Sequence, residues 1–473
     1  MDVKSILYKC NKCRDGYIGH VGDGIFVYNP LSEKGLAVLN KEAAFVFSLI
    51  NDQRAISDIV NLVQKEDGSA TLKDIQSLVG SFIDSEIVYI NSPKSKSFLF
   101  DRKPTHFGVW MHITNSCNLR CTYCYVHKTP DKMSEEIALK ATEKIMLSVK
   151  KHNVKKVTFK FAGGEPLLEL NKVLLVIKRV RGLGVEYGIE LEFVVITNGV
   201  LLSDAVCQKL KENNIRVAIS FDGLGEYHDK TRVFTNGLGS FKYVEKGIAN
   251  IIKHKIPFNV SITITQKNIE NIPELTAYLL NKQIPFAFNF YRENPFVHEA
   301  LEGDDKKLVE YLKKAYKLIR ENPSRHSVIN GILDRVSFKR PHLYACGMGL
   351  NYIVVRHDGK LISCQMTQDK VIGSIADDDL IITMLKGNFI EPTGLTVEGK
   401  KGCRECQWKY ICCGGCPLLS KEQKGTFDTN SPYCSVYKEL IPEALRIEAS
   451  RLIKYGSNGS KSLKQDIQSP YLS

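Results

Sequence analysis

The sequence lacks the long apolar runs that a membrane protein needs. No stretch of roughly 18 uncharged apolar residues occurs in the chain, whereas a membrane-spanning helix takes about 20 such residues. The first ten residues also lack the apolar core of a signal peptide. We therefore expect a protein that has no membrane partner and is cytoplasmic.

A dense block of lysine and arginine is also missing, although the chain is basic overall. Its net charge is +13, from 65 basic and 52 acidic residues. Residues 1–100 are close to neutral, with 11 basic and 12 acidic residues, so the surplus lies in the remainder. The surplus would suit an acidic partner, but a solvated basic surface explains it equally well. We expect no nucleic-acid partner, because clustered cations dominate binding to a phosphate backbone.

Cysteine, by contrast, is abundant, with 14 residues among 473. In a cytoplasmic protein such a set is more often metal-binding or catalytic than disulfide-bonded. Most of the cysteines fall into two groups, at 117–124 and 346–434. Cys10 and Cys13 form a two-cysteine knuckle without a second pair nearby, and no role is assigned to them.

The first group has the spacing Cys117-x3-Cys121-x2-Cys124 and follows an apolar run at 107–113. Three thiolates on one tight loop can hold three corners of a cubane iron–sulfur cluster. No fourth cysteine follows in the loop, so one iron is left open. The alternative is a structural zinc site with a distant fourth ligand, which the x3 gap and the aromatic residues Tyr123 and Tyr125 disfavour.

This loop resembles the signature of the radical S-adenosylmethionine (SAM) superfamily, in which the open iron binds the amino and carboxylate groups of SAM. Gly163-Gly164-Glu165-Pro166 matches a family element that contacts the SAM amino group. Ser220 and Arg232 are candidates for the ribose or carboxylate of SAM, although Arg232 equally suits a surface loop. The resemblance implies these SAM contacts: Tyr123, Tyr125, Gly163, Gly164, Glu165, Pro166, Thr197, Asn198, Ser220, Asp222 and Arg232.

Residues 106–300 alternate between strand and helix patterns, which predicts an α/β fold with a parallel sheet. Six repeats rather than eight suggest a partial (β/α)6 TIM-like barrel, as in radical SAM enzymes, with the chemistry at the carboxyl ends of the strands. A helical bridge is expected at 301–341. The expected strands are 107–113, 156–161, 191–197, 216–221, 258–265 and 286–291, and the expected helices are 134–151, 169–182, 203–213, 241–255 and 271–283.

Residues 17–92 combine short strands with three amphipathic helices. This pattern resembles the PqqD-like winged-helix domain, which binds the leader of a ribosomally made precursor peptide as an added strand. The alternative is a small structural cap. A linker is expected at 91–105 and a disordered tail at 456–473.

Residues 342–450 hold the second cysteine group, which closely resembles the SPASM extension of radical SAM maturases. A β-hairpin at 352–363 would bring Cys364 beside Cys346. The resemblance implies two auxiliary [4Fe-4S] clusters and hence three clusters in all; the odd cysteine count makes a pair of zinc ribbons the weaker alternative. The first would be held by Cys346, Cys364 and Cys416, and the second by Cys403, Cys406, Cys412 and Cys434.

Two positions depart from that resemblance. Relatives with a fully ligated first auxiliary cluster have another cysteine shortly after the position of Cys346, but residues 347–351 contain none. A substrate thiolate, a non-cysteine ligand or Cys413 would then complete that cluster. Sulfatase maturases carry a general-base Asp directly after the position of Cys364. Here that residue is Gln365, and an amide does not take up a proton as a carboxylate does.

The resemblance implies reductive cleavage of SAM and hydrogen abstraction from a ribosomally made peptide, installing a thioether or C–C crosslink. The expected partners are that precursor peptide and a reducing electron donor such as flavodoxin or ferredoxin. One alternative is a protein maturase of the anaerobic sulfatase type. Another is a redox-sensing regulator that binds nucleic acid. No catalytic acid or base is apparent in the sequence.

Overall fold

The protein is described by a computed structural model over most of the chain. It describes residues 10–13, 16–51, 53–66, 68–90, 105–297, 299, 301–387 and 395–456. The predicted linker and the predicted C-terminal tail fall almost entirely outside these ranges. No helix within them is both long and apolar enough to span a membrane.

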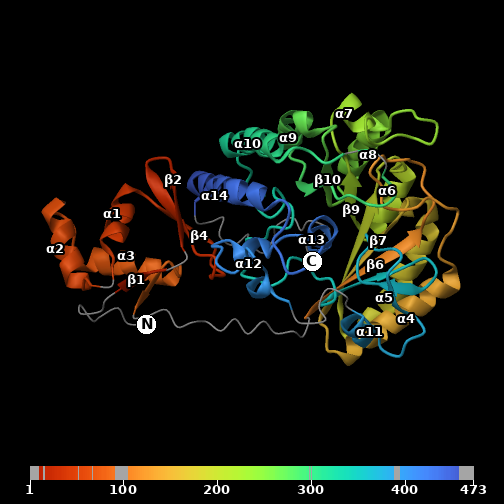
Figure 1. Cartoon of the computed structure of the whole chain (residues 1–473), viewed down its shortest axis with the longest axis horizontal. Helices are drawn as coiled ribbons and strands as arrows, with labels where there is room; N and C mark the ends of the chain where they lie inside the picture. The colour runs from red at the N-terminus through yellow and green to blue at the C-terminus, as the bar shows by residue number, and fades with distance from the viewer. Residues whose placement is uncertain are drawn as a thin grey trace.

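A parallel sheet of six consecutive strands forms the core of the larger part of the molecule, on the right in Figure 1. Each strand is paired with the next one along the chain, as right-handed β–α–β connections require. The six strands are β6 (His106–Thr114), β7 (Lys156–Gly163), β8 (Glu190–Thr197), β9 (Arg216–Ser220), β10 (Phe258–Ile264) and β11 (Phe286–Phe290). The predicted α/β fold, its parallel sheet and all six strand positions are confirmed.

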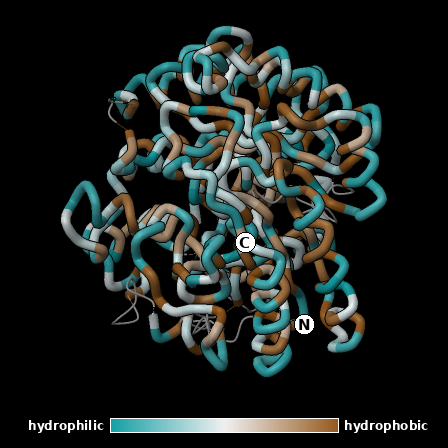
Figure 2. Tube along the Cα trace, turned by 90° about the vertical axis from the view of Figure 1, so that its right-hand side faces the viewer, coloured by the Kyte–Doolittle hydropathy of each residue, from teal (hydrophilic) through white to brown (hydrophobic). Residues whose placement is uncertain are grey.

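Helices fill the connections between these strands: α4 (Glu135–Lys151), α5 (Leu170–Tyr187), α6 (Asp204–Glu212), α8 (Phe241–Lys253) and α9 (Ile272–Asn281). Each has one buried face. In α8 the buried residues recur every three or four positions, and hydrophobic and hydrophilic segments alternate along the outer helices (Figure 2). The sequence predicted the end of α5 at residue 182, five residues too early. The helix runs to Tyr187, where Gly188 ends it in the left-handed conformation.

A hairpin from the C-terminal part of the chain extends the central sheet. The strand β12 (Tyr352–Val355) pairs in parallel with β6, and β13 (Lys360–Ile362) and β14 (Val371–Ser374) follow it. The sequence predicted the hairpin, but not its place beside β6. Since β6 is the first barrel strand, its outer edge needs a partner. As a result, the residues directly after β13 lie at the same end of the sheet as the cysteine loop.

Two long helices connect the barrel to the C-terminal region. The helix α10 (Asp305–Glu321), which lies within the helical bridge predicted at 301–341, packs along α14 (Cys434–Tyr455). The shorter elements of this region are α11 (Leu380–Lys386), α12 (Lys409–Cys412) and α13 (Pro417–Lys424). The second cysteine group is therefore enclosed by short helices and loops between β12 and α14.

The N-terminal unit contains an antiparallel sheet of β2 (Tyr17–Val21), β3 (Gly24–Tyr28) and β4 (Leu36–Leu39). Its helices are α1 (Lys41–Leu49), α2 (Ile56–Glu66) and α3 (Leu72–Asp84), as predicted, and β1 (Cys10–Lys12) pairs with β5 (Val88–Ile90). Strands β1 and β2 were not predicted. A hydrophobic core of its own joins Val27 and Leu39 to the three helices.

The opposite face of this small sheet packs against the rest of the protein. Phe26 and Tyr28 belong to the large core, and α14 lies beside β2 and β4 (Figure 1). The Tyr17 ring lies 5.1 Å from the ring of Trp408, and the Tyr28 ring lies 5.9 Å from that of Phe338. The N-terminal unit is therefore fixed to the region that carries the second cysteine group.

Candidate active site

The cysteine loop begins where β6 ends and is held by backbone hydrogen bonds from two other segments. Arg120 N and Thr122 N donate to the carbonyl oxygens of Val233 and Thr231, at 2.7 and 2.9 Å. Gly164 N donates to the Thr114 carbonyl at 2.6 Å. A Cβ atom on Gly164 would lie only 2.0 Å from the Ser116 carbonyl oxygen, so only glycine fits this close approach.

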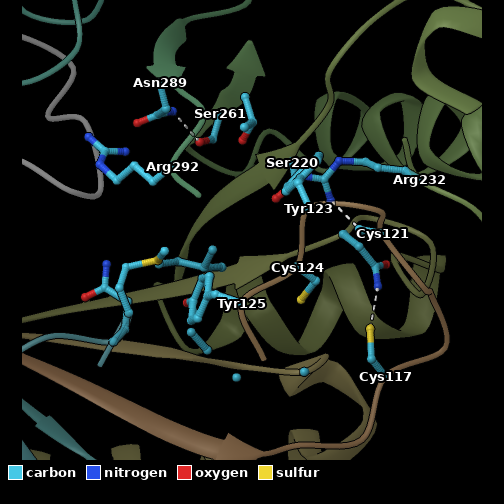
Figure 3. Close-up of a pocket in the computed structure, with 18 of the residues that line it drawn as sticks. Cys117, Cys121, Tyr123, Cys124, Tyr125, Ser220, Arg232, Ser261, Asn289 and Arg292 are labelled. Carbon is cyan, nitrogen blue, oxygen red and sulfur yellow. Dashed lines mark hydrogen bonds between the residues drawn. The ribbon is translucent and has the colours of Figure 1, made fainter. Parts of the chain in front are cut away.

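Hydrogen-bond donors and cations surround the three loop thiols. Asn198 Nδ2 lies 3.8 Å from Cys117 Sγ, and Arg232 Nη1 lies 3.7 Å from Cys121 Sγ (Figure 3). Burial lowers the pKa of the Lys128 ammonium group, whereas the neighbouring thiols, above all that of Cys124, raise this pKa. The effect of the thiols is the larger one, so the pKa of Lys128 is raised overall. These donors stabilise thiolate character, which a metal-bound cysteine requires.

The loop thiols suit a multi-iron cluster better than a single metal ion. They are free cysteines. The thiol of Cys124 affects that of Cys117 electrostatically, and the thiols of Cys117 and Cys124 both affect that of Cys121. Within the described ranges, no three His, Cys, Asp or Glu side chains are grouped so that they could hold one metal ion. In a cubane cluster each thiolate binds a different iron, so the sulfur atoms lie farther apart. This arrangement disfavours the zinc alternative.

A cavity opens beside the loop at the carboxyl ends of the barrel strands (Figure 3). Eight of the eleven predicted SAM contacts line it: Tyr123, Tyr125, Gly163, Gly164, Thr197, Asn198, Ser220 and Arg232. Three do not line it: Glu165, Pro166 and Asp222. The cavity therefore brings together most of the predicted SAM contacts, from the carboxyl ends of four strands, β6 to β9.

The Glu165 carboxylate faces the protein interior instead of the cavity. It is fully buried and accepts hydrogen bonds from Thr197 Oγ1 and Asn198 N, both at 2.8 Å, and from Leu167 N at 3.0 Å. Burial raises the pKa of this carboxyl group, and the three hydrogen bonds oppose that effect. Glu165 therefore fixes the end of β8 against the glycine turn, and its contact with SAM stays a prediction. Pro166 is buried in the short 3-10 helix η1 (Pro166–Glu169).

Asp222 likewise lies behind the cavity wall. Its Oδ1 accepts from Thr263 N at 2.8 Å, while its Oδ2 lies 2.5 Å from Arg232 Nε and also accepts from the hydroxyl of Tyr123. The carboxylate is fully buried, so it acts on the cavity through the two side chains that it holds. Arg232 is thus a buried residue of the wall, which corrects the alternative of a surface loop.

Several cavity residues were missed from the sequence. Lys128 lies only four positions after Cys124, so its proximity to the loop could have been inferred. Ser261, Thr263 and Asn289 line the cavity from the buried strands β10 and β11. Polar residues in otherwise apolar strands could have indicated a ligand site there. Arg292 and Arg335 had no such signal, because they lie in irregular segments outside any motif.

The cavity wall is cationic. Its charged lining residues are Lys128, Arg232, Arg292 and Arg335, and none of the described residues that line it is Asp, Glu or His. Gln365 and Met366, directly after Cys364, also line it. Gln365 Oε1 accepts from the Tyr352 hydroxyl at 2.9 Å. No conventional general base therefore lines the cavity in the described part of the chain.

The structure brings the C-terminal cysteines together in the two predicted sets. Burial, together with the nearby Cys416 and Cys346, raises the pKa of the Cys364 thiol to about 12. Burial likewise raises the pKa of the Cys412 thiol to about 12, with Cys403, Cys406 and Cys434 as its neighbours. These values belong to the thiols without metal, so binding of iron has to displace their protons.

Cys413 lies between the two sets but is engaged elsewhere. Its Sγ donates to the His342 carbonyl oxygen at 3.0 Å, and its side chain is fully buried. The residue adopts a left-handed conformation with φ of 48° at the end of α12. This position gives no support to Cys413 as the missing ligand of the first set.

Comparisons with known proteins agree with this architecture. The family model described as the radical SAM superfamily matches residues 111–279. A cysteine-type anaerobic sulfatase-maturating enzyme from Clostridium perfringens strain 13 is 26% identical over 375 residues, covering 73% of this chain and 96% of that enzyme.

Solved structures share the fold. The structure of anSMEcpe with bound AdoMet and the Cp18Cys peptide has a TM-score of 0.60 at 22% identity, covering 74% of this chain and 99% of that chain. Streptococcus suis SuiB bound to S-adenosylmethionine has a TM-score of 0.50 at 14% identity, covering 90% of this chain and 99% of that chain. At these identities the likeness concerns the fold alone.

Proposed function

Since this chain is a radical SAM enzyme homologous to anaerobic sulfatase-maturating enzymes, we propose that it modifies a peptide or protein substrate by hydrogen abstraction. The observation that supports this proposal most directly is the extent of the cavity. It reaches from Cys117, Cys121 and Cys124 to Gln365 and Met366, beside the first C-terminal cysteine set. A substrate residue in the cavity would lie between the two cysteine groups.

The cofactor assignments follow the residues that surround each group. Cys117, Cys121 and Cys124 would hold a [4Fe-4S] cluster, and SAM would bind along Gly163, Gly164 and the ends of β8 and β9. The sets Cys346/Cys364/Cys416 and Cys403/Cys406/Cys412/Cys434 would hold auxiliary clusters. When bound, the cluster and SAM would supply the radical chemistry that removes a hydrogen atom from a substrate carbon.

The protein's own side chains orient the ligand and exclude water. Asp222 holds the Arg232 guanidinium at the cavity wall, where its planar fork suits a carboxylate. Trp110 and Phe290 line the cavity and are almost fully buried. An apolar wall of this kind keeps water from the reacting atoms and strengthens the interactions of the charged groups.

Two kinds of substrate are compatible with this site. Homology over most of the chain favours a protein maturase of the anaerobic sulfatase type. Gln365 and the lack of a carboxylate among the described cavity residues favour the second candidate, which installs a thioether or C–C crosslink in a ribosomally made peptide. In that case a substrate thiolate would complete the first auxiliary cluster, for which only three cysteines come together.

The two candidates are separated by incubating the reconstituted enzyme anaerobically with SAM and dithionite. One reaction contains a cysteine-bearing sulfatase peptide, and the other a precursor peptide encoded beside the enzyme. We expect 5′-deoxyadenosine to form, and the modified peptide identifies the substrate class by mass spectrometry. A peptide with either crosslink loses two hydrogens, and in the thioether product the cysteine also no longer reacts with iodoacetamide. Absence of 5′-deoxyadenosine with both peptides after full reconstitution would overturn the proposal.

For the N-terminal unit we propose binding of the leader of a precursor peptide by a PqqD-like winged-helix domain. Among the described strands, β2 pairs only with β3, so its outer edge is available for an added strand. Ile18 on β2 is 48% exposed.

We expect Ile18→Glu to weaken binding of a fluorescein-labelled leader at least about fivefold, measured by anisotropy, by analogy with edge-strand recognition. Val185→Glu on the exposed face of α5 is the control, and equal effects of both would contradict the proposal.

A further inference from the structure

His112 is a histidine on β6 that neither the predicted motifs nor the cavity accounts for. Its side chain is fully buried, and it is not among the described residues that line the cavity. Its Nε2 lies 2.7 Å from Oδ1 of Asn115, the residue that opens the cysteine loop after β6. Within the described ranges its Nδ1 has no hydrogen-bond partner. The bond to Asn115 is therefore the polar contact through which His112 acts.

The direction of this hydrogen bond is fixed by a chain of side chains that ends at a carboxylate. Asn115 Nδ2 donates to Thr129 Oγ1 at 3.0 Å, and Thr129 Oγ1 donates to Asp131 Oδ2 at 2.6 Å. A carboxylate can only accept, so the hydroxyl group and then the amide group have to direct their hydrogens towards it. The amide oxygen of Asn115 is left facing His112. His112 therefore donates through Nε2.

The same residues join the two ends of the segment that carries the loop cysteines. Asn115 N donates to the Asp131 carbonyl oxygen at 2.8 Å, and Thr114 Oγ1 donates to the same oxygen at 2.9 Å. Ser116 Oγ donates to the Thr129 carbonyl oxygen at 3.2 Å. Bringing the ends of a loop together removes much of its conformational freedom. The closed base therefore limits the positions that the thiols can occupy.

His112 also contacts the glycine turn that follows β7. A Cβ atom on Gly163 would lie 3.3 Å from His112 Cδ2 and only 2.3 Å from the Thr114 carbonyl oxygen. Gly163 has a φ of 132°, which favours glycine, and it lines the cavity. One imidazole ring therefore lies against the turn and holds the start of the cysteine loop.

The imidazole of His112 is neutral. Burial lowers its pKa to about 4, and His357, Lys128 and Arg356 act in the same direction, against the hydrogen bond to Asn115. The ring of His357, from the turn between β12 and β13, lies 6.1 Å from that of His112. A neutral ring donates one hydrogen bond without placing a charge beside the loop. A glutamine side chain can take over that role, because its amide nitrogen is also a neutral donor.

We propose that His112 is a positioning residue for SAM binding, which holds the start of the cysteine loop, through Asn115, at a set distance from the glycine turn at Gly163. This inference rests on the proposed cluster and SAM sites. The loop would hold the cluster and the turn would line the SAM site, so their separation decides whether one SAM molecule can engage both. His112 touches neither group itself and acts through Asn115.

The test is a titration of the full-length, reconstituted and reduced protein with SAM, followed by electron paramagnetic resonance. The signal of the loop site is the one that disappears when Cys117, Cys121 and Cys124 are replaced by alanine. We expect SAM to change this signal in the wild type. We expect His112→Leu to raise the apparent dissociation constant for SAM about tenfold, or about 1.4 kcal/mol, because Asn115 Oδ1 loses its buried donor.

Further variants separate positioning from a general loss of packing. His112→Gln keeps a neutral donor and should bind SAM within about twofold of the wild type. Thr129→Val removes the next link of the chain with little change in side-chain shape, and should weaken SAM binding in the same direction. His106→Leu is the matched control, because His106 begins the same strand and lies 2.9 Å from Thr158 Oγ1, at the end remote from the loop. It should leave the SAM affinity unchanged.

Wild-type SAM affinity in His112→Leu, at full iron content, would overturn the inference. So would a His112→Gln variant that binds SAM no better than His112→Leu. If His112→Leu does not retain iron, the result for Thr129→Val decides, and wild-type affinity there counts against the inference. A wild-type loop signal that does not respond to SAM would overturn the proposed function as well, which distinguishes the two failures.

Discussion

Arg232 and Asp222 form a buried ion pair, with 2.5 Å between Nε of the arginine and Oδ2 of the aspartate. The same guanidinium reaches Cys121 Sγ through Nη1 at 3.7 Å and lies over the Tyr123 ring at 5.2 Å. The pair thus connects the end of β9 to the cysteine loop. Because both side chains are almost fully buried, neither charge has water as an alternative partner.

We predict that Asp222→Asn destabilises the protein by about 3–5 kcal/mol, because it leaves a buried guanidinium without its counter-charge. The loop should also retain less iron after anaerobic reconstitution, since Arg232 and Tyr123 lose their common acceptor. Thermal unfolding followed by circular dichroism and iron analysis measure the two effects. Asp204→Asn, which removes an exposed partner of Lys253, is the control and should change neither. A wild-type melting temperature for Asp222→Asn would refute the prediction.

Cys412 and Cys413 are adjacent in the chain but differ in their surroundings. The thiol of Cys412 lies among Cys403, Cys406 and Cys434, whereas that of Cys413 donates to a backbone carbonyl. We predict that Cys412→Ser removes about a third of the bound iron, the share of one of the three proposed four-iron clusters. Cys413→Ser should keep its hydrogen bond and the full iron content. Equal iron loss in both variants would contradict this distinction.

Lys160 is a buried lysine on β7 and should make stability depend on pH. Burial and the charges of Arg335 and Arg216 lower its pKa from 10.5 to about 7, against the opposing effect of Glu192. Between pH 7 and 10.5 the unfolded chain holds a proton that the folded chain lacks, so folding stability rises with pH across this range. Below pH 7 both states carry the charge, and the folded protein bears its full cost.

We predict that Lys160→Met stabilises the protein most below pH 7, by a difference on the order of 4 kcal/mol. The advantage over the wild type should shrink as the pH rises from 7 towards 10. Chemical denaturation at pH 6.5, 8 and 9.5 measures this difference. Lys140→Met, at an exposed position of α4, serves as the control, and a pH-independent difference for Lys160→Met would refute the argument.

The contact between Tyr17 and Trp408 should couple the N-terminal sheet to the C-terminal region. Aromatic pairs of this kind contribute about 0.5–1.5 kcal/mol beyond the area that they bury. We predict that Tyr17→Ala speeds hydrogen exchange of the backbone amides in residues 17–28, measured by mass spectrometry. Ile18→Ala is the matched control, because the Ile18 side chain is half exposed. The coupling is disproved if both variants exchange alike.

Much of the central fold was predictable because its signals are local. Short segments rich in apolar and β-branched residues identified every strand from β6 to β11, and helical spacing located the intervening helices to within a few residues. The end of α5 was missed, because residues 183–187 continue a helix beyond the last clear apolar repeat. The pairing of β12 with β6 was missed for another reason. A short strand can pair with any open edge, and only the packed sheet shows which edge is open.

The sequence by itself determined which cysteines are close neighbours along the chain, since the Cys117–Cys124 spacing is fixed by covalent geometry within one loop. It also indicated the glycine turn at Gly163 and Gly164, where a side chain would collide with the loop backbone. Only the tertiary structure decided which donors meet the thiols. Asn198 and Arg232 reach Cys117 and Cys121 from segments about 80 and 110 residues away.

The tertiary structure also decided the role of each charged group near the cavity. Glu165 and Asp222 sit in motifs that suggested direct ligand contact, and in the fold both carboxylates are fully buried and accept hydrogen bonds from neighbouring strand ends. Arg292 and Asp334 have no motif and still form a buried pair. A residue type and its spacing along the chain specify what a side chain can bind. Folding decides which of those partners it meets, because buried charges must pair with groups that only packing brings within reach.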